Sequence, residues 1–167
     1  MKTDLIIISV AMVLLVFLPF YLLPLLQHRG NQRISKIFKQ EAARKNLNLN
    51  IKNSWNLNHT GIDTTAQKLL VIQAHDEVKV HHFDLKEIKH TDLLISTLPV
   101  TKNGKTEDIL QRVEIEFSFY TKEERELLSL YDYDLDTYQD FEVKNAKQLH
   151  TEIQKMLMAH TVIKRTA

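Results

Sequence analysis

The feature that most constrains this chain is a long uncharged apolar run close to its N-terminus. From Leu5 to Leu26 there are 22 residues without a charged side chain, and only Ser9, Pro19 and Pro24 are not apolar. As a helix with a rise of about 1.5 Å per residue, this run would be about 33 Å long, which is enough to cross a hydrocarbon core of about 30 Å. We therefore expect a transmembrane helix over residues 5–27, preceded by a short extracytoplasmic tail of residues 1–4.

A cleaved secretory signal is the alternative interpretation of the same run. Such signals have an apolar core of about 7–15 residues, followed by a cleavage site with two small residues. The run here is longer, and the segment after it, residues 22–29, offers no pair of small residues. The pattern therefore favours an uncleaved signal-anchor.

The residues that follow the run are strongly basic. Six cations between residues 29 and 45 are opposed only by Glu41, and they are Arg29, Arg33, Lys36, Lys39, Arg44 and Lys45. Because positive flanks stay on the cytoplasmic side, this segment predicts a single-pass protein of the bacterial inner (cytoplasmic) membrane. Its N-terminus would lie outside and its C-terminal domain in the cytoplasm.

The basic segment has the spacing of a juxtamembrane helix over residues 28–46. Ile34, Ile37 and Phe38 recur at three- and four-residue intervals, with cations in the other directions. One interpretation places Arg29, Arg33, Lys36 and Lys39 on anionic lipid headgroups. We favour a connector that packs its apolar side chains on the following domain, because three large apolar residues make a weak membrane face.

From Leu47 onward the apolar period changes from about 3.6 residues to 2, which indicates β-strands. Gly61 to Thr65 interrupts the first alternation as a turn or bulge, and Asn103-Gly104 is a strong hairpin signal. We expect strands over residues 47–57, 68–74, 78–83, 89–98, 112–120 and 126–133. An amphipathic helix is predicted over residues 145–159, followed by a tail of residues 161–167.

This order predicts an N-terminal transmembrane helix followed by a mostly-β, α+β domain. The domain would be a small antiparallel barrel of about six or seven strands, capped by the C-terminal helix. Gly61-Ile62-Asp63 before Leu69-Leu70-Val71-Ile72, the connector 84–88 and Asn145-Ala146-Lys147 carry a further comparison. In these features residues 47–160 resemble a pleckstrin-homology-like (PH-like) domain of a membrane-anchored bacterial protein. The resemblance implies a binding or scaffolding module and supplies no catalytic residues.

Composition excludes several classes of function. There are no cysteines, only 3 glycines, and a formal net charge of +1. No thiolate metal site, thiol nucleophile or glycine-rich phosphate loop can be built from this set, and no global basic surface favours nucleic acid. No nucleophile elbow or His-Glu-x-x-His motif is present, so we predict no enzyme and no cofactor.

The acidic stretch after residue 131 partly matches a calcium loop. Asp132, Asp134, Asp136 and Asp140 occupy ligand positions, but Thr137 replaces the turn glycine and Val143 replaces the bidentate glutamate. These residues are weak metal candidates, and a solvated loop is the favoured interpretation. Tyr131, Tyr133 and Tyr138 are candidates for contact with a protein partner, since aromatic residues are enriched at interfaces.

Taken together, the patterns predict a single-pass, membrane-anchored interaction or scaffold protein, an accessory subunit of a membrane protein complex. Its partners would be the lipid bilayer and another membrane or cytosolic protein, or a second copy of the chain, and no nucleic acid. Two alternatives stay open at this point. One is a membrane-surface module that binds anionic lipid, and the other is a membrane-anchored enzyme of unknown reaction.

Overall fold

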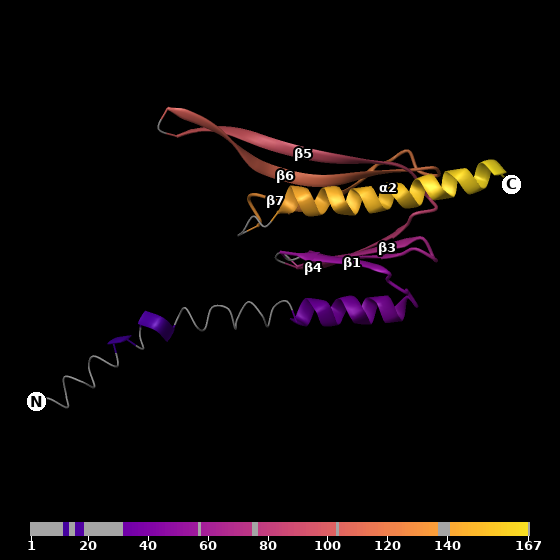
Figure 1. Cartoon of the computed structure of the whole chain (residues 1–167), viewed down its shortest axis with the longest axis horizontal. Coiled ribbons are helices and arrows are strands. Elements are labelled where there is room, and N and C mark those ends of the chain that lie inside the picture. The colour runs from indigo at the N-terminus through magenta and orange to yellow at the C-terminus, as the bar shows by residue number, and fades with distance from the viewer. Residues whose placement is uncertain are drawn as a thin grey trace, which may run out of the picture. The chain divides into compact units, whose positions relative to one another are not determined.

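The structure is a computed structural model, and it describes residues 12–13, 16–18, 32–56, 58–74, 77–102, 104–136 and 141–166. The chain divides into two units, Met1–Ile37 and Phe38–Ala167. In the first unit, residues 12–13, 16–18 and 32–37 are helical, and the last of these stretches continues to residue 44. The described residues of the second unit form seven strands and a C-terminal helix (Figure 1).

The strands form two antiparallel sheets in chain order. The first sheet consists of β1 (Ile51–Trp55), β2 (Asn58–Asp63), β3 (Lys68–Ala74) and β4 (Val78–Asp84). The second consists of β5 (Ile88–Lys102), β6 (Lys105–Phe119) and β7 (Glu126–Asp132). The helix α2 (Glu142–Thr166) contacts mainly β5 and β6. A turn over residues 85–87 carries the chain from the first sheet to the second.

One apolar core joins the two sheets and α2. The rings of Phe83 on β4 and Phe117 on β6 stack with their centroids 4.3 Å apart. Around this contact pack side chains from both sheets and from α2, among them Trp55, Ile62, Leu69, Val71, Val113, Ile115, Leu128, Leu149 and Ile153. Trp55, at the end of β1, is only 4% exposed and belongs to this core.

β3 is buried on both of its faces. Leu69 and Val71 belong to the core, whereas Leu70 and Ile72 point to the opposite face and are also fully buried. A strand covered on both faces has a continuous apolar run instead of an alternation. That run explains why the predicted strand over residues 68–74 coincides with β3.

The predicted transmembrane helix falls mostly outside the described residues, which include only 12–13 and 16–18 of residues 5–27. Within the described part of the chain, no helix is both long enough and apolar enough to cross a membrane. α2 has the length, at 25 residues, but carries charged side chains such as Lys147 and Glu152 along it. The finding contradicts the predicted transmembrane helix and the predicted single-pass inner-membrane location with a cytoplasmic C-terminal domain.

The prediction that the strands close into a single barrel is also wrong. The described residues form seven strands and a terminal helix, but among them the strands make two separate sheets, with neither β4 and β5 nor β1 and β7 paired. The physical reason lies in the turn after β4, which ends the first sheet and starts a new one. Some boundaries differ as well, since α2 begins at Glu142 and includes most of the predicted tail, residues 161–166.

Gly61 was expected in a turn or bulge, and it lies instead within β2. A Cβ at this position would lie 2.6 Å from the Leu49 Cδ1 and 2.7 Å from the Phe38 Cζ. The glycine is therefore required by the close approach of two apolar side chains to the strand, not by a turn.

Candidate functional site

The acidic residues after β7 form a hydrogen-bonded turn. The Asp134 backbone N–H donates to the Asp132 Oδ1 (3.0 Å), and the Arg112 Nε donates to the Asp132 Oδ2 (3.0 Å). The Asp132 N–H donates to the Asp136 Oδ2 (2.8 Å), and the Asn56 Nδ2 to the Asp136 Oδ1 (3.2 Å). These carboxylates thus satisfy local donors, as aspartates commonly do in turns.

The same contacts bear on the weak metal candidates. Among the described residues, no group of three or more His, Asp or Glu side chains is placed to hold a metal ion. Asp140, the fourth metal candidate, lies outside the described residues. Of the histidines on β4, His81 stacks on Phe83 with ring centroids 6.2 Å apart, whereas the His82 Nε2 lies 3.6 Å from the Glu41 Oε2. The two rings therefore point to different neighbours, as expected for adjacent strand residues.

The tyrosines proposed for partner contact occupy different environments. Tyr131 belongs to the core and is only 3% exposed, and its burial raises the pKa of its phenol, with the nearby Asp136 carboxylate acting in the same direction. Tyr133 is 55% exposed. Tyr138 lies outside the described residues. Of the three, Tyr133 is the one whose side chain the structure places at the surface.

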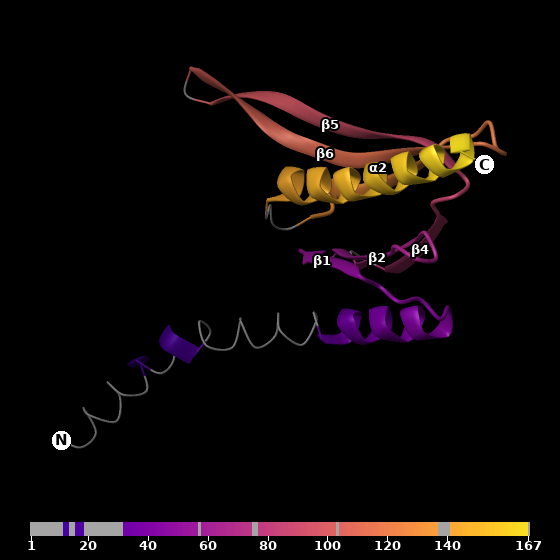
Figure 2. The same ribbon diagram turned by 45° about the vertical axis from the view of Figure 1, so that its right-hand side comes forward.

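β5 and β6 continue beyond β7 as a two-stranded arm. Each strand has 15 residues, whereas β7 pairs only with the stretch of β6 from Arg112 to Phe117. We define the arm as residues 97–102 of β5, the turn residue Gly104, and residues 105–110 of β6. Figures 1 and 2 both show this hairpin running past the start of α2. Most of its described side chains are exposed, whereas Val100 and Ile109 are partly buried and Leu110, at its base, is buried.

Three apolar side chains gather on one face of the arm. Leu98 and Ile109 are direct cross-strand partners, and Val100 lies two residues from Leu98, so all three point the same way. Beside them the Tyr133 N–H donates to the Gln111 carbonyl oxygen (2.9 Å), which holds the end of β7 against β6. The result is a pocket of about 160 Å³ lined by Leu98, Val100, Ile109, Leu110, Gln111, Tyr133 and Asp134. We call it the arm pocket.

The arm pocket has one charged lining residue, Asp134. Glu107 is the cross-strand partner of Val100 and shares the same face of the arm, as does Lys105 two residues earlier. The nearby cation Arg112 is already paired with Asp132. An apolar pocket with carboxylates at its rim is suited to an apolar side chain that is followed or preceded by a cation.

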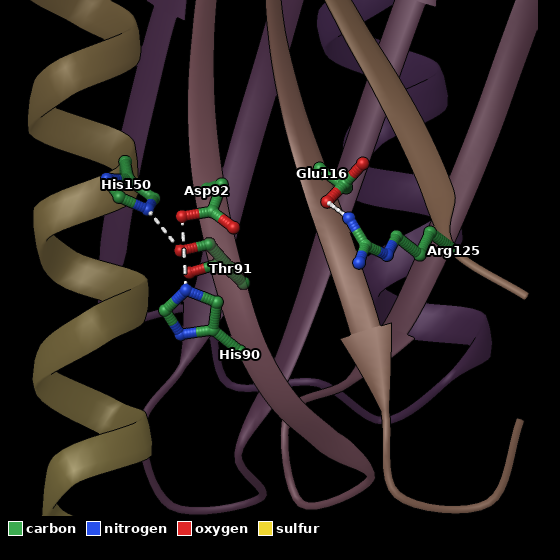
Figure 3. A network of polar contacts seen from close by, with 6 residues as sticks. All are labelled: His90, Thr91, Asp92, Glu116, Arg125 and His150. Atoms are coloured by element: carbon green, nitrogen blue, oxygen red, sulfur yellow. Dashed lines mark hydrogen bonds and ion pairs between the residues drawn. The ribbon is translucent and has the colours of Figure 1, made fainter. Parts of the chain in front are cut away.

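A set of polar contacts involves β5 and α2 (Figure 3). The His90 Nε2 lies 3.1 Å from the Asp92 Oδ1, and both side chains are exposed, so this contact is worth little in water. The His150 Nε2 lies 3.0 Å from the Thr91 carbonyl oxygen, which attaches α2 to β5. Thr91 takes part in this contact through its backbone carbonyl and not through its hydroxyl.

The third contact in Figure 3 is an ion pair on the outer face of the second sheet. The Arg125 Nη1 donates to the Glu116 Oε1 at 2.7 Å. Arg125 precedes β7 and Glu116 lies on β6, so the pair fixes the chain as it enters β7. It is a structural contact on an exposed face, of the kind that contributes about 0–1 kcal/mol.

The basic residues predicted for a membrane surface fall in both units. Arg33 and Lys36 lie in the first unit and Lys39 in the second, and all three are exposed on helical residues. Arg29 lies outside the described residues. Their role at a membrane surface stays a prediction.

The arm pocket was not predicted from the sequence. Leu98, Val100 and Ile109 carry the one signal that could have found it. Leu98 and Val100 are two residues apart, and a two-residue turn at Asn103-Gly104 places Ile109 opposite Leu98 on the same hairpin face. The contribution of Tyr133 depends on how the loop after β7 folds back on β6, which alternation alone does not contain.

Comparisons with models of protein families, with curated proteins and with solved structures find no match to this chain. No residue role is therefore transferred from a relative. The interpretation of the arm pocket rests on its own geometry and chemistry.

Proposed function

We propose that this chain is a protein-binding module and that its arm pocket receives an apolar side chain of a partner polypeptide. The observation that carries the proposal is the apolar face of the arm, where Leu98 is 51% exposed beside Val100 and Ile109. A two-stranded ribbon without a third strand is only marginally stable in water. Apolar side chains held out on such a ribbon are best explained by a surface that covers them.

The charges around the pocket support a partner of defined chemistry. Asp134 and Glu107 place carboxylates beside the apolar wall. A partner segment with a large apolar residue next to Lys or Arg would fill the pocket and pair with this rim. Complementary charges of this kind raise the association rate and select against acidic partners.

The resemblance to PH-like domains stays part of the same proposal. A four-stranded sheet, a three-stranded sheet and a terminal helix support it in coarse terms. Many functions occur on one fold, so the arm pocket and not the fold carries the functional argument.

Site-specific photo-crosslinking in cells that naturally express the full chain tests the proposal. A photoreactive phenylalanine analogue is placed at Leu98, and a matched control is placed at Leu127, an apolar residue of β7 that is 56% exposed and does not line the pocket. We expect Leu98 to crosslink one defined polypeptide, through a segment with an apolar residue beside a cation, and Leu127 not to do so. Identical crosslinks from both positions, or none from Leu98, would contradict the proposal.

The acidic rim is tested in the same cells. Asp134→Asn combined with Glu107→Gln should reduce the Leu98 crosslink by about threefold to tenfold, because two charges facing the partner are removed. Glu124→Gln removes an exposed charge in the turn before β7 and should leave the crosslink unchanged. A crosslink to a second copy of this chain would argue for self-association and against a separate partner.

A further inference from the structure

One edge of β6 has no strand beside it along the arm. β7 pairs with β6 over Arg112 to Phe117, and the bond from the Tyr133 N–H to the Gln111 carbonyl oxygen follows. Residues 133–135 then form a turn, so β7 ends before it reaches the arm. Beyond Gln111, no strand of the described residues lies on this side of β6, and Figure 1 shows the arm as β5 and β6 alone. We call this side of β6, over residues 105–110, the open edge.

The backbone groups of Thr106 and Asp108 face the open edge. In a two-residue hairpin the residues on either side of the turn bond to each other, and here they are Lys102 and Lys105. The direction of the backbone groups alternates along a strand, so residues 105, 107 and 109 of β6 bond to β5. The N–H and C=O groups of Thr106 and Asp108 therefore point away from β5. Edges of this kind accept an added strand, whose backbone extends the ladder.

The arm pocket lies beside the open edge, where β7 stops. Tyr133 and Asp134, which directly follow β7, line it together with Leu98 and Ile109. Leu98 and Ile109 are cross-strand partners on one face, so a residue opposite Ile109 on an added strand would extend their row. Its side chain would lie against Ile109 and Tyr133. The pocket therefore suits an apolar side chain that is carried by a strand.

Two charged residues continue the same face toward the turn. Glu107 and Lys105 lie two and four residues before Ile109 in β6, and both side chains are exposed. An added strand that continues the direction of β7 runs antiparallel to β6, so it passes Ile109 first, then Glu107 and then Lys105. Opposite charges are favourable at directly opposed positions, and like charges are not. The face therefore selects an apolar residue, then a cation, then an acid, each two positions apart.

We propose that the partner of the arm binds as an added third strand, antiparallel to β6, with an apolar residue, a cation and an acid at alternate positions. The apolar side chain enters the arm pocket, the cation pairs with Glu107 and the acid pairs with Lys105. Neighbouring side chains on one face of a strand belong to residues two positions apart, which fixes where the cation of the partner lies. The inference rests on the proposed function and adds the conformation, the direction and the charge order of the partner segment.

A seven-residue peptide titrated into the full chain, followed by NMR, tests strand addition. Its sequence is threonine-leucine-threonine-lysine-threonine-glutamate-threonine, with both ends blocked. In the proposed complex the second and third threonines exchange hydrogen bonds with Asp108 and Thr106, whereas the N–H groups of leucine and lysine point away from β6. N-methylation of those two threonines should weaken binding at least about tenfold, because it removes two backbone donors at the open edge. N-methylation of leucine and lysine is the matched control and should change the affinity less than about twofold.

The outcomes separate this inference from the proposed function. No saturable binding of the parent peptide up to about 5 mM, which corresponds to a very weak interaction, would overturn strand addition. Equal affinity of the two methylated peptides would also overturn it, but would leave the arm pocket as a site for a side chain. The absence of a defined crosslink from Leu98 in cells would instead contradict the proposed function itself.

Exchange of charges tests the direction and the register of the added strand. A second peptide, with its lysine and glutamate exchanged, places like charges opposite Glu107 and Lys105 and should bind at least about threefold more weakly. Glu107→Lys combined with Lys105→Glu should invert this preference. Asp108→Lys, at an exposed position on the opposite face of the arm, is the control and should keep the preference of the parent chain. Amide shifts outside the arm show that each variant is folded, and an unchanged preference in the double variant would overturn the proposed register.

Discussion

The Gln73 Nε2 on β3 donates a hydrogen bond of 2.9 Å to the Asn58 Oδ1 on β2, and both side chains are buried. The pair also reaches the second sheet, because the Asn58 Nδ2 donates to the Leu130 carbonyl oxygen (2.9 Å) and the Gln73 Nε2 donates to the Ser129 carbonyl oxygen. Two amides therefore connect β2 and β3 to β7 inside an otherwise apolar core. A buried network of this kind stabilises the fold only when every polar group in it has a hydrogen-bond partner.

Removing one amide should therefore be costly. Asn58→Ala leaves the Leu130 carbonyl and the Gln73 amide without their buried partner, so we expect a loss of about 2–4 kcal/mol in the free energy of unfolding. Urea unfolding followed by circular dichroism measures it. Asn48→Ala, which truncates an exposed asparagine side chain, is the control and should cost less than about 0.5 kcal/mol. In a double-mutant cycle Asn58→Ala and Gln73→Ala should be strongly non-additive, and additive costs would show that the amides act independently.

Asp63 supplies a pH-dependent part of the stability. Its carboxylate accepts hydrogen bonds from the backbone N–H groups of Ala66 (2.8 Å), Asn48 (2.7 Å) and Thr65 (3.0 Å), and the bond from Ala66 contributes most to lowering its pKa. A lowered pKa in the folded state means that this stabilisation is complete above the unfolded pKa of about 3.9. It is lost as the pH falls through the folded value.

We therefore expect Asp63→Asn to lower the free energy of unfolding at pH 7 by about 2 kcal/mol, because a charged acceptor of three N–H groups is replaced. The difference from the parent chain should shrink as the pH falls below about 4, where the aspartate is also neutralised. Denaturant unfolding at pH 7 and pH 3 measures both values. Asp108→Asn, at an exposed position of the arm, should show no such pH-dependent difference. A difference for Asp63→Asn that is the same at both pH values would contradict the role of the charge.

These polar contacts show why β2 could not be predicted from its residues. Its sequence, Asn58 to Asp63, is largely polar and lacks the alternation of a half-buried strand, yet almost all of it is buried. Its burial depends on partners that are distant in the sequence, such as Gln73 and the backbone of β7. Hydrogen bonding of this kind leaves no periodic signal.

β3 and the turn between β5 and β6 could be predicted from the sequence, because a single local pattern specifies each of them. The continuous apolar run Leu69–Ile72 indicates a strand buried on both faces, and Gly104, with φ of 76°, ends the hairpin turn as Asn103-Gly104 predicted. The arm was missed because only Leu98, Val100 and Ile109 keep an apolar spacing there, and few of its side chains are buried. Within the arm pocket, Tyr133 alone was named beforehand as a contact candidate, and its neighbours on β5 and β6 required the register.

The contact of Gly61 with the helical segment should make this position intolerant of a side chain. Gly61→Ala places a Cβ against buried Leu49 and Phe38, so we expect a loss of about 1–3 kcal/mol in the free energy of unfolding from overpacking. Thermal and urea unfolding measure the loss. In a background of Phe38→Leu, which removes the ring atom nearest the new Cβ but leaves the Leu49 Cδ1 in place, the added cost of Gly61→Ala should fall. An unchanged cost would show that the closer contact with Leu49, and not the contact with Phe38, requires the glycine.

The arm should open far more readily than the sheet from which it extends. Its residues have neighbours on only one edge and few buried side chains, whereas Val113, Ile115 and Phe117 of the same strand β6 lie between β5 and β7 in the core. Local opening free energies follow such differences in burial and pairing. We expect the hydrogen-bonded amides of the arm to exchange with solvent at least about 100-fold faster than those of Val113 to Phe117, as measured by native-state hydrogen exchange and NMR. Similar protection along the whole of β6 would contradict an independently opening arm. It would also remove the argument that a partner is needed to order it.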